Sequence, residues 1–405
     1  MSDPRSIKSF TLVELLIVIA ILAVLAATVV LVLNPAELLA QARDTQRMAD
    51  LDTARDAVDF FIIDNPSASL GTSQRVYISI PDTSATCANI TGLPTLPVGW
   101  QYVCVTAANL RNVNGTGWIP LDLSAIKGGS PMPYLPVDPS NDATIGRYYT
   151  YTPGGSYEFT ALLEARKNFA SIKDGGDFPE MYELGSDLSL LPVSRDTSLV
   201  GYWKLDEGSG NATADFSGKG NNGTLIGGPI WQSGANCKRG GCLSFDGSDD
   251  YVNGGHGSSL DMTDAVTVFV WEKISGTSTD YNRFVTKQGG FASYFATRYG
   301  DGFTVFYIDG VKNWVINGYP ELQNGSWHQV AVTYDKNGGA NNMRLYSDGA
   351  LRASTTATGS LPVSVQDLAI GNASYAKFGG SLDEVRIYNR ALTDMEIRSL
   401  YDSTK

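Results

Sequence analysis

The chain has 405 residues and a formal net charge of −12. A chain of this length is expected to form two or three domains rather than one. Lysine and arginine are outnumbered by acidic residues and scattered, and phosphate binding needs a basic patch, so no nucleic-acid partner is expected. Glycine is abundant and helical periodicity is confined to about the first 65 residues, so the remainder is predicted to be mostly β.

The N-terminal segment is a long apolar helix with one carboxylate. Residues 10–33 are uncharged except for Glu14, and they follow a short leader, residues 1–9, that contains Arg5 and Lys8. At about 1.5 Å per residue the apolar segment spans roughly 36 Å, enough to cross a hydrocarbon core of about 30 Å. A carboxylate near one end of such a span is costly in lipid, so Glu14 is expected to have a partner and a function.

This N-terminus resembles that of type IV prepilins and type II secretion pseudopilins. The resemblance rests on Ser9-Phe10-Thr11-Leu12-Val13-Glu14-Leu15-Leu16. It implies that prepilin peptidase cuts between Ser9 and Phe10, that Phe10 is then methylated, and that Glu14 pairs with the Phe10 ammonium of a neighbouring subunit. The family usually has glycine where Ser9 stands, which is a departure at the cleavage site.

The resemblance also implies a bacterial single-pass protein that sits in the inner membrane and then in a surface pilus or a periplasmic pseudopilus. A secretory signal peptide and a plain membrane anchor are the alternatives. A signal peptide should end in an Ala-x-Ala-like site, whereas Asn34-Pro35 follows here. A plain anchor leaves Glu14 unexplained.

Residues 34–65 are predicted to continue as an amphipathic helix, and residues 66–185 as a pilin-like head. Apolar side chains recur three or four positions apart in the helix, at Leu38, Ala42, Met48, Leu51, Ala54, Val58 and Phe61. Short strand-like runs follow, separated by Gly, Pro and Asn. With the resemblance, these patterns predict an α+β domain in which the long helix packs on a small antiparallel sheet.

A loop in the head is similar to the one that precedes the final hairpin of major pseudopilins. It runs over residues 135–142 and is followed by strand-like runs at residues 148–151 and 157–161. In some relatives this loop holds calcium, and Asp138 and Asp142 are the carboxylates available for it here. An ordinary Asp-Pro turn is the alternative.

The four cysteines form two close pairs, Cys87 with Cys104 and Cys237 with Cys242. Close pairs in an exported chain indicate disulfides. Neither pair has the spacing of a zinc site, and the chain contains only two histidines.

Residues 186–197 have no clear period and are predicted to be a linker. Residues 198–405 alternate apolar and polar positions between turns, which predicts about ten strands in an all-β sandwich or jelly roll. Thr393 to Glu396 form a capping box that opens a short C-terminal helix.

This C-terminal part resembles the laminin-G-like, concanavalin A-like jelly-roll family. Five blocks carry the resemblance in order: residues 202–210, 215–225, 243–252, 327–331 and 380–392. Relatives with this fold include lectins and glycoside hydrolases, so the fold alone does not decide the function.

A hydrolase is the less expected function. A retaining enzyme needs two carboxylates about 5 Å apart on one face, and the Glu-x-Asp-x-x-Glu strand of such relatives is missing from residues 198–405. Asp383 and Glu384 are adjacent and are therefore predicted to point to opposite faces, and Asp249 and Asp250 share this defect. We expect a binding protein rather than an enzyme.

A structural calcium ion is the expected cofactor. The loop of residues 215–223 combines a carboxylate with Gly and Asn, whose backbone carbonyls suit a hard cation. In relatives such a loop and the first Asp of the Asp-Glu-Val-Arg strand hold calcium, which implies Asp215 and Asp383 here. The alternative is a turn of small polar residues, with Asp383 paired to an arginine.

The sequence gives less information about the ligand than about the fold. Most tryptophans are expected in the core, and the candidate ligand-binding aromatics are Tyr281, Phe291, Tyr294 and Tyr299. The sequence predicts an exported pilin-like subunit whose lectin-like module adheres to glycans or surface proteins. The alternative is a minor pseudopilin-like structural protein whose jelly roll contacts other proteins.

Overall fold

The structure is a computed structural model. It describes residues 12–21, 35–165, 170–171, 173–176, 178, 181–274, 281–287, 296–298, 303–308, 310–311, 314–318, 325–363, 365–373 and 376–405. Residues 12–21 are helical. Within the described ranges, no helix combines the length and the apolar character needed to cross a membrane.

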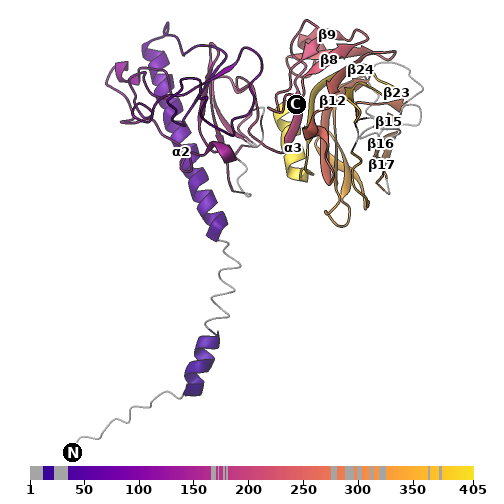
Figure 1. The fold of residues 1–405 in the computed structure, drawn as a ribbon, viewed down its shortest axis with the longest axis horizontal. Helices are drawn as coiled ribbons and strands as arrows, with labels where there is room; N and C mark the ends of the chain where they lie inside the picture. The colour runs from indigo at the N-terminus through magenta and orange to yellow at the C-terminus, as the bar shows by residue number, and fades with distance from the viewer. Residues whose placement is uncertain are drawn as a thin grey trace, which may run out of the picture.

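The N-terminal part of the molecule sets a long helix, α2 (Pro35–Asp64), beside a five-stranded sheet (Figure 1). Asn65 ends the helix, since its backbone N–H and its side-chain amide both donate to the Phe61 carbonyl. The sheet order is β2-β1-β3-β4-β5. Its strands are β1 (Arg75–Ile78), β2 (Gln101–Val103), β3 (Thr150–Pro153), β4 (Tyr157–Leu162) and β5 (Met181–Gly185). The β1–β2 pair is parallel and the others are antiparallel, so the edge departs from the predicted antiparallel sheet.

Helix and sheet share one buried cluster. Leu51, Ala54 and Val58 from α2 are fully buried in it, together with aromatic residues of β3 and β4. The rings of Tyr151 and Phe159 lie 5.0 Å apart. From Leu51 onward the predicted apolar stripe therefore packs on the strands, whereas Leu38 and Ala42, nearer the start of α2, are exposed.

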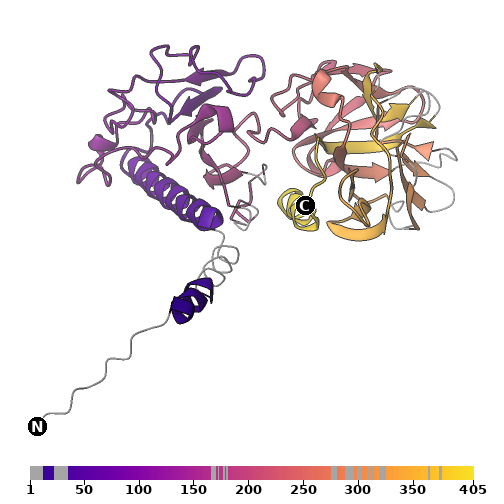
Figure 2. The same ribbon diagram turned by 60° about the horizontal axis from the view of Figure 1, so that its bottom comes forward.

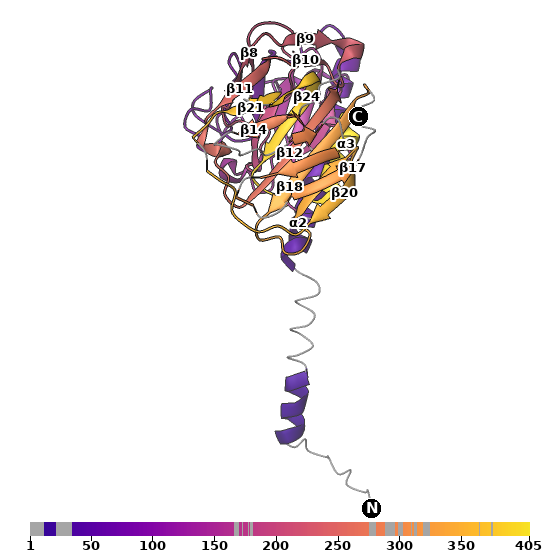
Figure 3. The same ribbon diagram turned by 90° about the vertical axis from the view of Figure 1, so that its right-hand side faces the viewer.

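The C-terminal part is a β-sandwich, as predicted. Its large sheet has the order β20-β19-β18-β12-β24-β10-β9, and β6 also pairs with β24. These strands are β6 (Leu199–Trp203), β9 (Ile230–Ser233), β10 (Gly241–Asp246), β12 (Ala265–Ile274), β18 (His328–Asp335), β19 (Met343–Ser347), β20 (Ala350–Thr355) and β24 (Gly379–Tyr388). Figure 3 shows β24, β12 and β18 side by side across this sheet.

The opposing layer is made of shorter sheets. One has the order β14-β21-β11-β8-β7 and another the order β13-β15-β16-β17, and β22 pairs with β23. Their bounds are β7 (Ala212–Thr213), β8 (Gly223–Ile226), β11 (Tyr251–Gly255), β13 (Tyr281–Asn282), β14 (Val285–Lys287), β15 (Ala296–Arg298), β16 (Phe303–Tyr307), β17 (Trp314–Gly318), β21 (Leu368–Ile370), β22 (Asn372–Ala373) and β23 (Ala376–Lys377).

Strand β12 shows how alternation builds two buried faces. Val268 and Val270 point into the core between the sheets, whereas Phe269 and Trp271 belong to a second cluster on the outer face of the large sheet. Helix α3 (Asp394–Thr404) covers part of that outer face, on the side of the sandwich nearest the N-terminal part (Figure 2). The predicted capping box of Thr393 and Glu396 opens this helix.

The segment predicted as a linker is packed rather than extended through solvent. Residues 191–195 are all buried. The backbone N–H of Ser194 donates to the carbonyl of Phe216 at 3.1 Å, which ties the segment to the sandwich. A Cβ on Gly218 would lie 2.9 Å from Cβ of Pro94, so a sandwich loop also lies directly against the N-terminal part.

Candidate functional site

The processing and assembly residues lie at the N-terminus. Ser9 and Phe10 fall outside the described residues, while Glu14 lies on the helix of residues 12–21. The apolar side chains of that helix are exposed, with Leu12 at 78% and Ile21 at 55%. Such an apolar surface needs lipid or other subunits around it.

Asp138 is held by an arginine of the long helix. Nε and Nη2 of Arg47 lie 2.6 Å and 3.0 Å from the two carboxylate oxygens of Asp138, and both side chains are fully buried. Arg47 also donates to Asp44 at 2.8 Å. The Arg47 guanidinium thus supplies a positive charge to both carboxylate oxygens of Asp138.

Asp142 has a separate, local function. Its carboxylate accepts hydrogen bonds from the backbone N–H and the hydroxyl of Thr144, which caps a short 3₁₀ turn. Asp138 is therefore engaged in a buried ion pair and Asp142 in a local cap. Calcium binding by the two remains a prediction.

Asp215 organises the loop that follows β7. Its two carboxylate oxygens accept four hydrogen bonds, at 2.8 to 3.0 Å, from the backbone N–H groups of Tyr202, Ser217 and Asn221 and from the Ser217 hydroxyl. The loop is thus folded around the carboxylate, with its amides pointing inward. Amides pointing inward are the arrangement for an anion rather than a cation.

Asp383 and Asp206 hold the disulfide loop. The backbone N–H groups of Lys238 and Arg239 donate to Asp383 at 3.0 Å and 2.9 Å, and the N–H of Gly241 donates to Asp206. Both predicted disulfides, Cys87–Cys104 and Cys237–Cys242, are present. Burial raises the pKa of Asp206 to about 6. Burial and the nearby Glu384 carboxylate raise the pKa of Asp383 well above its ordinary range.

The predicted pair Asp215 and Asp383 is held by two different loops. Asp215 accepts from the amide of Tyr202, which pairs with Arg386 of β24, whereas Asp383 accepts from the amides of the disulfide loop. Calcium binding at this pair remains a prediction.

The prediction that Asp383 and Glu384 point to opposite faces is wrong. Asp383 pairs with Trp271 and Arg386 with Phe269, so two residues of β24 oppose one of β12. This is a β-bulge, and Glu384 has a φ of 52° there. Glu384 accepts hydrogen bonds from Arg386 at 2.7 Å and from the Tyr202 hydroxyl at 2.8 Å on the outer face. Both carboxylates are buried.

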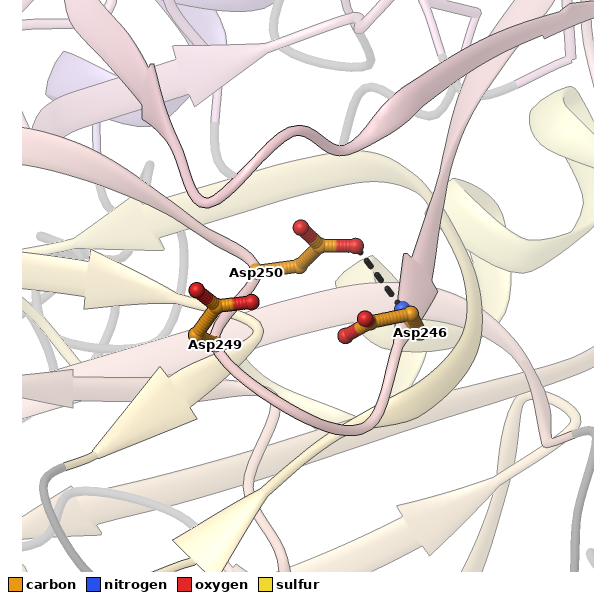
Figure 4. A group of neighbouring side chains, drawn as sticks. All are labelled: Asp246, Asp249 and Asp250. Atoms are coloured by element: carbon orange, nitrogen blue, oxygen red, sulfur yellow. Dashed lines mark hydrogen bonds between the residues drawn. The ribbon is translucent and has the colours of Figure 1, made fainter.

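Three aspartates that the sequence did not bring together form an acidic cluster in the structure. Figure 4 shows Asp246, Asp249 and Asp250 around the turn between β10 and β11, with their carboxylates within 4.8 Å of one another. The Asp246 N–H donates to the Asp250 carboxylate at 2.9 Å. Among the described residues this is the group of three whose spacing suits a metal, although such acidic turns are also common without one. The close spacing Asp-x-x-Asp-Asp was the signal in the sequence.

The predicted aromatic ligand residues are little described. Tyr281 lies on β13 opposite Arg298, while Phe291, Tyr294 and Tyr299 fall outside the described residues. Their role in binding remains a prediction.

A polar cleft opens elsewhere on the sandwich. Its volume is about 470 Å³, within the range of roughly 300–1,000 Å³ that small-ligand sites occupy. Segments far apart in the sequence line it, which is why no local motif marked it: Thr197, Val200, Lys219, residues 258–259, residues 261–265 and Asn389.

Comparisons with known proteins identify both ends of the chain. Residues 4–30 match the family described as the prokaryotic N-terminal methylation motif. Residues 246–398 match the concanavalin A-like lectin/glucanases superfamily. The chain thus has a prepilin-type N-terminus and a concanavalin A-like domain. A comparison with curated proteins found no match.

Several solved structures are similar to this chain at low sequence identity. Domain 4 of AbnA, a GH43 extracellular arabinanase from Geobacillus stearothermophilus solved with arabinotriose, is 21% identical at a TM-score of 0.41, covering 50% of this chain and 98% of that domain. The binding domain of Paraclostridial Mosquitocidal Protein 1 is 15% identical at a TM-score of 0.41, and the match covers 51% of this chain and 52% of that one. A Trypanosoma rangeli sialidase is 15% identical at a TM-score of 0.37, and the match covers 53% of this chain and 33% of the sialidase. The chain thus spans about half the length of the toxin domain, and such likenesses say nothing about ligand or activity.

Proposed function

We propose that this chain is an exported, pilin-like subunit that presents its β-sandwich as a module for adhesion to glycans or surface proteins. The prepilin-type N-terminus supports export and assembly through other pilin or pseudopilin subunits and prepilin peptidase. We place the chain in the inner membrane before assembly and in a pilus or pseudopilus afterwards. Residues 35–185 would be the pilin-like head, since a long helix packs there on a small sheet.

The observation that carries the proposal is the buried junction between head and sandwich. Arg195 reaches from the connecting segment into the head, where its guanidinium lies 4.6 Å from the Tyr148 ring centroid and donates to the carbonyls of Gly146 and Tyr148. A buried guanidinium with these acceptors cannot leave the head without losing several hydrogen bonds at once.

The sandwich contributes the other half of the junction. The Lys204 ammonium lies 4.9 Å from the ring of Phe216, 5.7 Å from that of Phe178 and 5.8 Å from that of Tyr202. Phe178 belongs to the head, and its ring meets Tyr202 edge-on at 5.8 Å. The sandwich is therefore fixed on the head, so assembly of the head would set the direction in which the sandwich faces.

We propose binding rather than catalysis. The carboxylates first considered as a hydrolase pair, Asp383 and Glu384, are buried and engaged in holding the fold.

The full chain in detergent, applied to a glycan array and to a pull-down with surface proteins, tests the module. Adhesion predicts glycan or surface-protein hits. Hits confined to proteins of the assembly itself would support the structural alternative instead. Separately, Glu14→Ala should leave membrane insertion intact and cripple assembly, and normal assembly of that variant would contradict the pilin-like part.

A further inference from the structure

We propose that the polar cleft beside the junction is the glycan-binding site of the sandwich and that it takes neutral sugars. This inference rests on the proposed adhesive function and names its site. The cleft has a volume of about 470 Å³, and the polar side chains that line it include Lys219, Asp261, Asp264 and Asn389.

The cleft is preformed by hydrogen bonds between its walls. The side-chain amide of Asn221 donates to the Ser259 hydroxyl at 2.9 Å and to the Val200 carbonyl at 2.7 Å. The N–H of Asn389 donates to the carbonyl of Ser198 at 2.8 Å. Because the walls are already fixed, a ligand need not order them on binding, which lowers the entropic cost of binding.

The Asp261 carboxylate is oriented by the buried side chain of Lys287. Lys287, only 1% exposed, donates to its carboxylate and to the Leu260 carbonyl at 3.0 Å. Nε2 of His256 lies 3.8 Å from the other carboxylate oxygen. A carboxylate held in this way presents fixed acceptors to the cleft, as a binding site requires.

The mixture of groups matches the two kinds of surface on a sugar ring. Ala265 offers apolar surface to a C–H face, and the buried side chains of Val200 and Met262 form the apolar floor beneath it. Asp261 and Asp264 accept hydrogen bonds from hydroxyls, and Lys219 and Asn389 donate them. Two carboxylates at the rim disfavour sialylated or uronic ligands through like-charge repulsion, so the class is neutral glycans.

Single rim variants of the full chain test the site on an array of neutral and sialylated oligosaccharides. Asp264→Ala and Lys219→Ala change exposed side chains and should keep the wild-type melting temperature. We expect each to lower binding to neutral glycans at least tenfold. Arg398→Ala is the matched control, because Arg398 is an exposed side chain of α3 that pairs with Asp402 at 2.9 Å and does not line the cleft, so this variant should bind as wild type.

Three outcomes would overturn the inference. Glycan binding that both rim variants retain would move the site elsewhere while leaving the adhesive function intact. A preference for sialylated glycans would contradict the ligand class. A wild-type chain that binds no glycan at all would remove the cleft proposal together with the glycan part of the proposed function.

Discussion

At the scale of single residues, Glu272 has the clearest consequence for pH. It is fully buried on β12 and pairs with Leu382 of the core. Neither of its carboxylate oxygens has a hydrogen-bond partner among the described residues. Burial raises its pKa well above the ordinary value. A raised pKa means that stability is fully present below the unfolded pKa of about 4.3 and is lost as pH rises toward the folded pKa.

We therefore predict that Glu272→Met stabilises the protein at pH 8 by at least about 1 kcal/mol. The gain should shrink toward about pH 3, because the wild-type carboxyl is then protonated in both states. Urea unfolding at several pH values measures this. Glu272→Gln is the control, since it removes the titration but keeps a buried polar group. The same pH dependence in all three proteins would contradict the account.

Two arginines of α2 give a matched comparison. Arg47 is fully buried between Asp44 and Asp138, whereas Arg55 is about one-third exposed beside Asp52 and Asp56. Arg47→Ala should lower the free energy of unfolding by about 3–5 kcal/mol, because it leaves buried carboxylates without a positive partner. Arg55→Ala should cost about 0–1 kcal/mol. Thermal unfolding of both variants checks the difference, and equal losses would refute the buried pair.

The sequence singled out Asp138 as a loop carboxylate but not its partner, since Arg47 lies 91 residues earlier in the chain. Arg47 lies outside the apolar stripe predicted for the helix. Only the tertiary fold shows that the head loop covers this part of the helix and converts an exposed charge into a buried one.

At the scale of elements, the loop after β7 is held by hydrogen bonds to Asp215. Asp215→Ala should lower stability by more than about 2 kcal/mol, since it removes four acceptor contacts to one charged group. The loss should be equal in calcium and in chelator, which melting curves in both conditions can show. A calcium-dependent stabilisation that disappears in this variant would restore the predicted site.

Elements with local signals were predicted well. The capping box of α3, the two disulfides and the β-sandwich are confirmed. The bulge at Glu384 was missed, because simple alternation assumes one residue opposite another. Nothing local to Asp383 and Glu384 reports a register shift that depends on the neighbouring strand β12.

At the scale of the whole molecule, head and sandwich should unfold together. Phe178 is buried in the junction against Tyr202 and Lys204. Phe178→Ala should cost about 3–5 kcal/mol and should split one calorimetric transition into two. Tyr134→Ala, at a ring that is 64% exposed on the head, is the control and should leave one transition. Two transitions in the wild-type protein would show that the junction does not couple the parts.

The packing of the linker was not foreseen at this scale. Residues 186–197 lack a period because they form neither helix nor strand, and such segments are usually exposed. Here their side chains find partners in both halves, as Arg195 does in the head. The polar cleft was equally invisible, since its walls come from segments that meet only after folding.

The central claim is that one processed, assembling subunit carries the sandwich. The most direct test is the intact mass of the protein purified from the membranes of producing cells. We predict the mass of residues 10–405 with one added methyl group and both disulfides oxidised. A mass that retains residues 1–9, or that fits a cut near Ala26–Ala27, would contradict the claim.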